Sequence, residues 1–133
     1  MSDLFVFLNH QLTIAQRNEA MNTFGIASII FLPDDLRSLW SNIPPYNDLD
    51  LSILSRFTGW LIQNAKKGDY VLVQGEYGAV FYIVDCCFQK DYIPIYATTQ
   101  RKSRETVKAD GTIERNLIFQ HIGFRRYHRW ESN

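Results

Sequence analysis

Apolar and polar stretches alternate along the chain in a pattern that predicts strands separated by helices. Leu4–Leu8 is a continuous apolar run, typical of a strand covered on both faces, and it ends abruptly at a polar segment. Ser28–Leu32 and Tyr70–Val73 predict two more buried strands, and Tyr92–Tyr96 predicts a short fourth strand. Four strands are therefore expected before residue 97.

Capping signals and helical spacing predict four helices in the intervals. Thr13 and Gln16 form a capping-box pattern that opens a helix over about Ile14–Phe24, and Gly25 is its expected stop. The segment Asn42–Asp50 has the composition of a loop. The other helices are predicted from Pro33-Asp34-Asp35 before Leu36 and Trp40, from Leu51, Leu54, Phe57 and Leu61, and from Val80, Ile83, Val84 and Cys87.

The last third of the chain has a different pattern. The polar segment Ala97–Lys102 predicts a loop, and two extended segments follow, Glu105–Lys108 and Thr112–His121. They flank Asp110-Gly111, a strong hairpin turn signal. Strands that alternate with helices indicate a parallel sheet with right-handed crossovers, here extended by the hairpin. The predicted architecture is a single Rossmann-like α/β domain over residues 1–133.

Composition and charge narrow the classes of function. With 133 residues, 46% hydrophobic and 14% aromatic, the chain can bury one continuous core, which excludes disorder and a fibrous repeat. Fourteen basic residues balance fourteen acidic ones, so binding to long nucleic acid through bulk charge is not expected. The balance is uneven, however, since residues 1–100 carry a net charge of −4 and residues 101–133 carry +4. A small polyanion could still find a basic surface.

The cysteines and the first predicted strand indicate the cellular compartment in which the protein works. Cys86 and Cys87 are neighbours, cannot form an ordinary disulfide with each other, and lack zinc-site spacing, which favours a reduced, cytoplasmic setting. Leu4–Leu8 is too short for a signal or membrane segment, so no membrane association is expected. The histidines are widely separated, and the helix dipole explains Asp34 and Asp35. No metal or other cofactor is expected.

Three polar loops are the main candidate site. In an open parallel sheet, ligands bind beyond the carboxyl ends of the strands, so the loops after the first, third and fourth strands should line one edge. Together they offer amides, hydroxyls, an imidazole, a carboxylate and two cations. The loops are Asn9-His10-Gln11, Gln74-Gly75-Glu76-Tyr77-Gly78 and Thr98-Thr99-Gln100-Arg101-Lys102.

The glycine loop has two interpretations. Gly75 and Gly78 could let the backbone approach a phosphate at the start of the following helix. A tight strand-to-helix turn is an equally good explanation, because the spacing falls short of a dinucleotide fingerprint. Glu76 would repel a phosphate placed on it, so it either bonds a base or hydroxyl or is a solvated carboxylate at the helix start.

The remaining polar residues also carry alternatives. His10 could transfer protons near neutral pH, or it could be a loop histidine bonded to nearby backbone. The segment Thr98–Lys102 could bind anionic oxygens, or it could be the charged edge of a hairpin. His121 shares the alternating face of its strand with apolar residues, which favours a partly buried structural role. His128 lies in a basic tail, where solvation is the default.

Four segments carry a resemblance to a known family. The chain resembles the small stand-alone proteins of type III CRISPR loci, which are similar to CARF (CRISPR-associated Rossmann-fold) domains and include ring nucleases that act on cyclic oligoadenylate. The likeness spans nearly the whole chain. The segments are Leu-Asn-His-Gln-Leu-Thr-x-x-Gln at positions 8–16, Leu-Pro-Asp-Asp-Leu and Leu-Trp-Ser-Asn-Ile-Pro-Pro within 32–45, Gly-Asp-Tyr-Val-Leu-Val-Gln-Gly-Glu-Tyr-Gly-Ala at 68–79, and Pro-Ile-Tyr-Ala-Thr-Thr-x-Arg at 94–101.

The resemblance implies a CARF-like homodimer that binds cyclic tetra-adenylate across its two-fold axis and cuts it to linear oligoadenylates, ending an antiviral signal. A ring of four nucleotides contains a two-fold operation, so two copies of each loop could meet it. Cleavage would use a ribose 2′-hydroxyl as internal nucleophile. His10 is then the candidate acid or base, and Arg101 or Lys102 the group that stabilises the developing charge.

Binding roles follow for the other loop residues. Gln11, Gln74 and Thr99 would position the ring, and Glu76 and Tyr77 would contact adenine or ribose. Two other functions stay open. A dimer could bind the ring as a sensor or sequestering protein without cutting it, and an α/β module could recognise a protein instead of a nucleotide.

Overall fold

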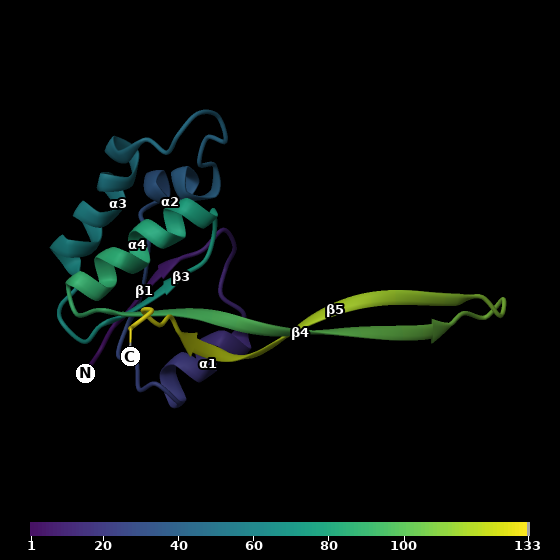
Figure 1. The fold of residues 1–133 in the computed structure, drawn as a ribbon. Coiled ribbons are helices and arrows are strands. Elements are labelled where there is room, and N and C mark those ends of the chain that lie inside the picture. The colour runs from purple at the N-terminus through teal and green to yellow at the C-terminus, as the bar shows by residue number, and fades with distance from the viewer. Residues whose placement is uncertain (133) are drawn as a thin grey trace.

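The fold is built on one five-stranded sheet with the strand order β2-β1-β3-β4-β5. The computed structural model describes residues 1–132, and Figure 1 shows the arrangement. The first four strands are mutually parallel and the last is antiparallel, which confirms the predicted α/β sheet with a closing hairpin. The strands are β1 (Leu4–Phe7), β2 (Ile29–Phe31), β3 (Tyr70–Val73), β4 (Ile93–Val107) and β5 (Ile113–Arg126).

The helices cover the two faces of the sheet unequally. One face packs on α1, and α2, α3 and α4 lie over the other, as Figure 1 shows. Because β1 is an interior strand with helices on both faces, its alternate side chains enter two separate cores, and each of them is buried. The helices are α1 (Ile14–Asn22), α2 (Asp34–Ser41), α3 (Leu51–Asn64) and α4 (Tyr77–Gln89).

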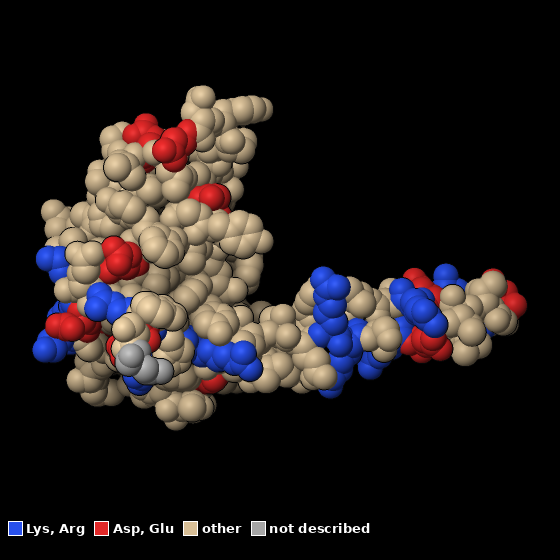
Figure 2. All heavy atoms as spheres, viewed as in Figure 1, with Lys and Arg blue, Asp and Glu red and all other residues tan. Residues whose placement is uncertain are grey.

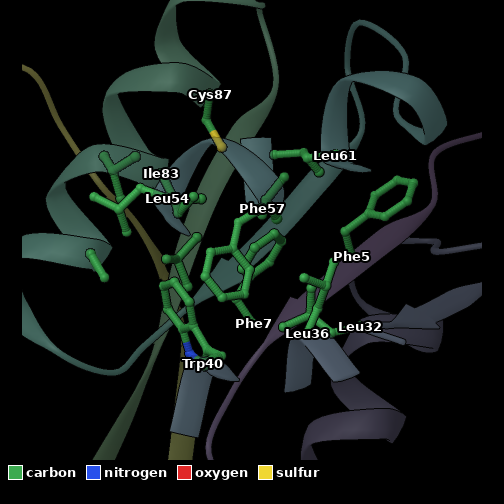
Figure 3. Packing of buried hydrophobic residues seen from close by; sticks show 14 of the residues in the cluster. Phe5, Phe7, Leu32, Leu36, Trp40, Leu54, Phe57, Leu61, Ile83 and Cys87 are labelled. Carbon is green, nitrogen blue, oxygen red and sulfur yellow. The ribbon is translucent and has the colours of Figure 1, made fainter. Parts of the chain in front are cut away.

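Aromatic side chains fill the larger core, between the sheet and the three helices on that face. Phe7 from β1 meets Trp40 edge-on, with ring centroids 5.3 Å apart, and lies 6.2 Å from Phe57. Trp40 and Phe57 are themselves 5.2 Å apart (Figure 3). Such edge-to-face packing fixes ring orientation as well as burying area. The core therefore holds α2 and α3 firmly against the carboxyl half of β1.

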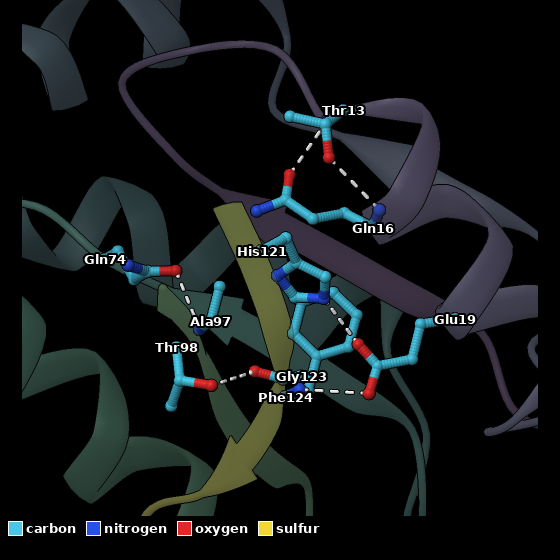
Figure 4. Close-up of polar contacts among 9 residues, drawn as sticks. All are labelled: Thr13, Gln16, Glu19, Gln74, Ala97, Thr98, His121, Gly123 and Phe124. Carbon is cyan, nitrogen blue, oxygen red and sulfur yellow. Dashed lines mark hydrogen bonds and ion pairs between the residues drawn. The ribbon is translucent and has the colours of Figure 1, made fainter. Parts of the chain in front are cut away.

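Local signals set the start and end of α1 as predicted. The Thr13 side chain accepts from the Gln16 backbone N–H (3.1 Å), and the Gln16 side chain accepts from the Thr13 N–H (2.9 Å), which completes the capping box (Figure 4). The helix ends at Asn22, two residues before the predicted end. Gly25 then adopts a φ of +64°, a left-handed conformation that favours glycine, and the chain turns toward β2.

The last two strands differ most from the prediction. Ala97–Lys102 is not a loop, because β4 continues through it to Val107 and pairs with β5 along that whole length. The polarity of the segment reflects exposure on a two-stranded ribbon and not the end of a strand. The Asp110-Gly111 turn is confirmed, with Gly111 at a φ of +84°. We call the projecting part of the hairpin, Gln100–Gln120, the arm, and the rest of the described chain the body.

Candidate functional site

The carboxyl ends of the parallel strands meet at one edge of the sheet. Phe7 at the end of β1 pairs with Val73 at the end of β3. Gln74, the next residue, connects three strands, since its N–H donates to the Phe7 carbonyl (3.0 Å) and its side-chain oxygen accepts from the Ala97 N–H of β4 (2.9 Å; Figure 4). The carboxyl end of β3 therefore lies beside the end of β1 and beside Ala97 of β4, at the carboxyl edge of the sheet.

A cavity of about 550 Å³ opens at the carboxyl ends of β1 and β2, between α1 and α2. Its size falls in the range of small-molecule sites. We call it the His10 crevice. Its floor is apolar, from residues at the ends of the two strands, and its rim is polar. The polar residues used below are Asn9, His10, Gln11, Arg17, Arg37 and Ser38.

Two guanidinium groups give the crevice a positive character. Arg17, on the first turn of α1, lies over the Phe31 ring at 5.5 Å from its centroid and forms no ion pair within residues 1–132. Arg37, on the first turn of α2, pairs with Asp34 at 2.9 Å, and both partners are exposed. Two cations and one carboxylate leave a net positive charge in a body that is otherwise acidic. An anion is the ligand that this arrangement favours.

His10 presents one ring nitrogen to its own backbone and keeps the other free for chemistry. Its Nδ1 lies 2.9 Å from the Gln11 carbonyl oxygen. A carbonyl only accepts, so the bond places a hydrogen on Nδ1 and leaves a lone pair on Nε2 in the neutral ring. His10 is therefore bonded to nearby backbone, as one interpretation expected, and its ring also lines the cavity, while proton transfer by His10 stays a prediction.

The glycine loop is shaped by packing and not by a ligand. A Cβ on Gly75 would lie 2.9 Å from the Trp40 ring nitrogen, which donates to the Gln74 carbonyl (3.0 Å). The Glu76 carboxylate accepts from the Gly78 and Ala79 N–H groups at 3.0 and 2.8 Å, and so caps α4. The Glu76 carboxylate therefore occupies the start of α4, where a bound phosphate would otherwise lie. The geometry favours a tight strand-to-helix turn over a phosphate loop.

Tyr77 and Gly78, beside this cap, have different surroundings. The Tyr77 side chain is 92% exposed and forms the outer surface of α4. Gly78 faces Leu49, and a Cβ there would come within 2.5 Å of a Leu49 methyl. Neither residue lines the His10 crevice.

The predicted cations of the fourth loop lie outside the crevice. Thr98 donates its hydroxyl hydrogen to the Gly123 carbonyl (2.8 Å), and Thr99 pairs with His121, so both belong to the hairpin (Figure 4). Arg101 stacks on Phe119 at 5.3 Å, and Lys102 points to the opposite face of the arm. The predicted loop at Thr98–Lys102 is wrong, because β4 continues through it, and neither Arg101 nor Lys102 lines the His10 crevice.

Arg17 and Arg37, which line the cavity together with His10, were not predicted from the sequence. Arg17 and Arg37 each stand on the first turn of the helix that follows a parallel strand. That position was the available signal, since the first turn of such a helix lies beside the carboxyl edge of the sheet.

Comparison with known sequences places the chain in a family. Residues 2–125 match the model described as "Uncharacterized protein MJ1673 family". The chain belongs to the MJ1673 family. It is 40% identical over 128 residues to uncharacterized protein MJ1673 of Methanocaldococcus jannaschii, which covers 96% of this chain and 98% of that protein. No solved structure matches the chain.

In this MJ1673-family chain His121 bonds to a helix of the body, and the two thiols are held protonated. The His121 Nε2 lies 2.6 Å from a Glu19 oxygen of α1, and its side chain is only 7% exposed, which confirms the predicted structural role (Figure 4). Cys86 and Cys87 are both free, and burial raises the pKa of each thiol. They are therefore poor nucleophiles at neutral pH.

Two negative findings apply to residues 1–132 of the MJ1673-family chain. Within that range no three His, Cys, Asp or Glu side chains gather closely enough to hold a metal ion. The helices described over the same residues are too short or too polar to cross a membrane.

Proposed function

We propose that this chain is a ring nuclease that binds cyclic oligoadenylate, with cyclic tetra-adenylate as the expected ring, and opens it to linear oligoadenylates without a metal. In that role it would end type III CRISPR antiviral signalling. The observation that carries the proposal is the His10 crevice, where one imidazole and two guanidiniums line a cavity at the carboxyl edge of the sheet. The resemblance of segments 8–16, 32–45, 68–79 and 94–101 to that family supports the choice of ligand.

Binding would divide the ring between charged and neutral groups. Arg17 is free to form charge-assisted hydrogen bonds with a phosphate. Arg37 can bind a second phosphate oxygen with the guanidinium N–H groups that its ion pair with Asp34 leaves unused. The amides of Asn9 and Gln11 suit base or ribose edges. One crevice would hold part of a four-nucleotide ring, and a second chain related by a two-fold axis would hold the rest.

Cleavage would proceed by attack of a ribose 2′-oxygen on the adjacent phosphorus. The O2′–P bond forms, the P–O5′ bond breaks, and a 2′,3′-cyclic phosphate and a 5′-hydroxyl result. His10 Nε2 would take the proton from the 2′-hydroxyl, and the leaving 5′-oxygen would gain one from solvent or from a protonated imidazole. Arg17 or Arg37 replaces Arg101 and Lys102 as the group that stabilises charge on the phosphate.

Product analysis tests the proposal. The protein would be incubated with a molar excess of cyclic tri-, tetra- or hexa-adenylate in the presence of a chelator, and the products separated by chromatography. Several turnovers to linear products that end in a cyclic phosphate are expected with the tetramer. Intact ring bound in a fixed ratio would instead favour sequestration, and no binding at all would favour a protein-recognition module.

A matched pair of histidine variants tests the role of His10. His10→Ala should lower the rate of ring opening by roughly 10²- to 10⁴-fold with little change in affinity, because a general base acts mainly in the transition state. His128→Ala is the control, since His128 is exposed and lies in a different groove, beside α4. Equal rates in the two variants would remove His10 from the mechanism.

A further inference from the structure

The arm is a ribbon with no cover on either side. Every residue of Gln100–Gln120 is exposed, and none of them belongs to either core cluster. Figure 1 shows the two strands leaving the body and extending well beyond it. An isolated two-stranded hairpin is marginally stable in water, and long exposed strands tend to pair with other chains. The arm therefore needs a partner surface.

The two faces of the arm differ in chemistry. Residues directly opposite each other in an antiparallel pair point to the same face, and successive residues along a strand point to opposite faces. One face carries four large apolar side chains, with Leu117 56% and Phe119 58% exposed. The opposite face is mainly polar and carries Lys102 and Arg104. We define the apolar face by Val107, Ile113, Leu117 and Phe119.

The apolar face continues a sheet face that is covered in the body. His121 and Thr99, at the root of the arm, lie on this same face. His121 contacts Glu19 of α1, so α1 covers the face at that point. Beyond His121 the described chain supplies no helix above this face, although large apolar side chains continue along it among charged ones. This pattern is typical of a strand that buries one face against a second layer of structure, and here another molecule would have to supply that layer.

The accessible surface is large enough to supply a stable interface. It measures 8990 Å² for a 15.6 kDa chain. A compact monomer of that mass exposes about 7,200 Å², so roughly 1,800 Å² is in excess. A standard protein interface buries about 800 Å² on each partner. The excess therefore exceeds what one symmetric contact requires.

The charges favour protein over nucleic acid as the partner of the apolar face. Glu105 and Arg115 lie on this face and pair with each other at 3.0 Å. Arg101 lies over Phe119. Lys102 and Arg104, which form no ion pair with any of residues 1–132, belong to the other face. Figure 2 shows basic side chains along the arm, with acidic side chains among them toward its tip.

We propose that the apolar face of the arm packs against a second copy of this chain and forms a two-fold symmetric dimer. Each copy carries the same nearly neutral apolar face, so one symmetric contact covers both at once. The polar face then stays in water. This inference does not depend on cyclic oligoadenylate, and the arm lies within the range, residues 2–125, that matches the family.

The dimer can be tested by measuring the molecular mass of variants substituted on the apolar face and of variants substituted at neighbouring positions on the polar face. By sedimentation or light scattering at micromolar concentrations, the wild-type chain should have twice its 15.6 kDa mass. Leu117→Lys and Phe119→Glu should raise the dissociation constant at least about thirty-fold. Asn116→Lys and Gln120→Glu, their neighbours on the polar face, should leave it unchanged within about threefold, as rim substitutions do.

Hydrogen exchange of the wild-type chain gives a second readout that does not depend on how the variants fold. Protection of amides in the arm should rise with protein concentration, and protection in the body should not. A wild-type chain that stays monomeric overturns the proposal, and so do equal effects from both faces. A monomer that binds mixed-sequence RNA and loses that binding in Lys102→Ala would also overturn it and assign the arm to nucleic acid.

Discussion

Arg17 is the side chain on which ring binding should depend most strongly. It stacks on Phe31 without an ion pair to any of residues 1–132, so its charge is available to a phosphate. Arg17→Gln should weaken binding of cyclic tetra-adenylate about tenfold or more at low salt, and less at high salt, where screening weakens the wild-type interaction. Calorimetric titration at two salt concentrations measures both effects.

The control for Arg17→Gln removes a similar contact elsewhere. Arg129 lies over the Phe88 ring at 5.0 Å, outside the His10 crevice. Arg129→Gln therefore loses a cation–π contact but no group of the crevice, and the affinity for the ring should stay as in the wild type. An equal loss in both variants would show that binding responds to net charge and not to this site.

Asp69 is a buried carboxylate that the fold keeps ionised. Only 1% of the side chain is exposed, and it accepts from the Asp3 N–H (3.0 Å), the Lys66 N–H (2.8 Å) and the Lys66 ammonium (2.9 Å). Burial alone would raise the pKa of Asp69, but the hydrogen bonds and the Lys66 charge outweigh it and hold the pKa below the ordinary value of 3.8. The contacts tie the start of β1 to the start of β3.

Asp69→Asn should lower the free energy of unfolding at pH 7 by about 1–3 kcal/mol, because an amide cannot satisfy all three donors. A depressed pKa stabilises the fold above the ordinary carboxyl pKa, and this contribution is lost as pH falls through the lower folded value. The difference between wild type and variant should therefore shrink below about pH 4. Urea unfolding at pH 7 and at acidic pH measures it.

Asp85→Asn provides the comparison for this variant. Asp85 is exposed on α4 and bonds only Gln89 among residues 1–132 (2.9 Å). Its substitution should change the free energy of unfolding by no more than about 0.5 kcal/mol at either pH. A difference for Asp69→Asn that stays constant or grows in acid would contradict the assignment of a depressed pKa.

At the scale of elements, the turn from β3 into α4 is fitted to α2. Gly75→Ala should lower the free energy of unfolding by about 1–3 kcal/mol, because the new methyl group would meet the buried Trp40 ring at 2.9 Å. Gly59→Ala is the matched control: Gly59 lies inside α3 and has open space at its Cβ position. That variant should gain up to about 1 kcal/mol from helix propensity. Thermal unfolding of both variants measures the contrast.

Sequence patterns predicted the elements of the body well because local physics decides them. The apolar run Leu4–Leu8, the capping box at Thr13 and the stripe on α4 each depend on residues close in sequence, and each was confirmed. The arm was missed for a related reason. Polarity in Ala97–Lys102 reports exposure, which loops and uncovered strands share, and only the pairing with β5 separates the two.

The candidate site was predicted in part, less well than the body and better than the arm. Strand topology placed His10 at the correct edge, because parallel strands end together. It did not identify Arg17 or Arg37, because the search was limited to the loops and left out the first turns of the helices that follow them. Nor did it show that Glu76 would cap its own helix, because a carboxylate at a helix start suits a cap and a ligand contact equally.

For the whole molecule, the division into body and arm predicts that the body folds without the arm. Neither core cluster contains a residue of Gln100–Gln120. A variant in which Asn-Gly replaces Arg101–Phe119 should keep the His121 contact with Glu19 and unfold cooperatively, with helix content unchanged by circular dichroism. It should match monomeric Leu117→Lys in thermal stability within a few degrees. Loss of cooperative unfolding would show that the arm supports the body.

The interior position of β1 in the sheet has a consequence for synthesis on the ribosome. β1 is made first and its neighbour β2 follows soon after, but its other neighbour β3 lies 66 positions later along the chain. At about 5–20 residues per second, the nascent segment Leu4–Leu8 waits roughly 3–13 seconds before β3 exists. During that interval one edge of this apolar strand lacks its partner, so chaperone capture should concentrate at the N-terminus of unfinished chains.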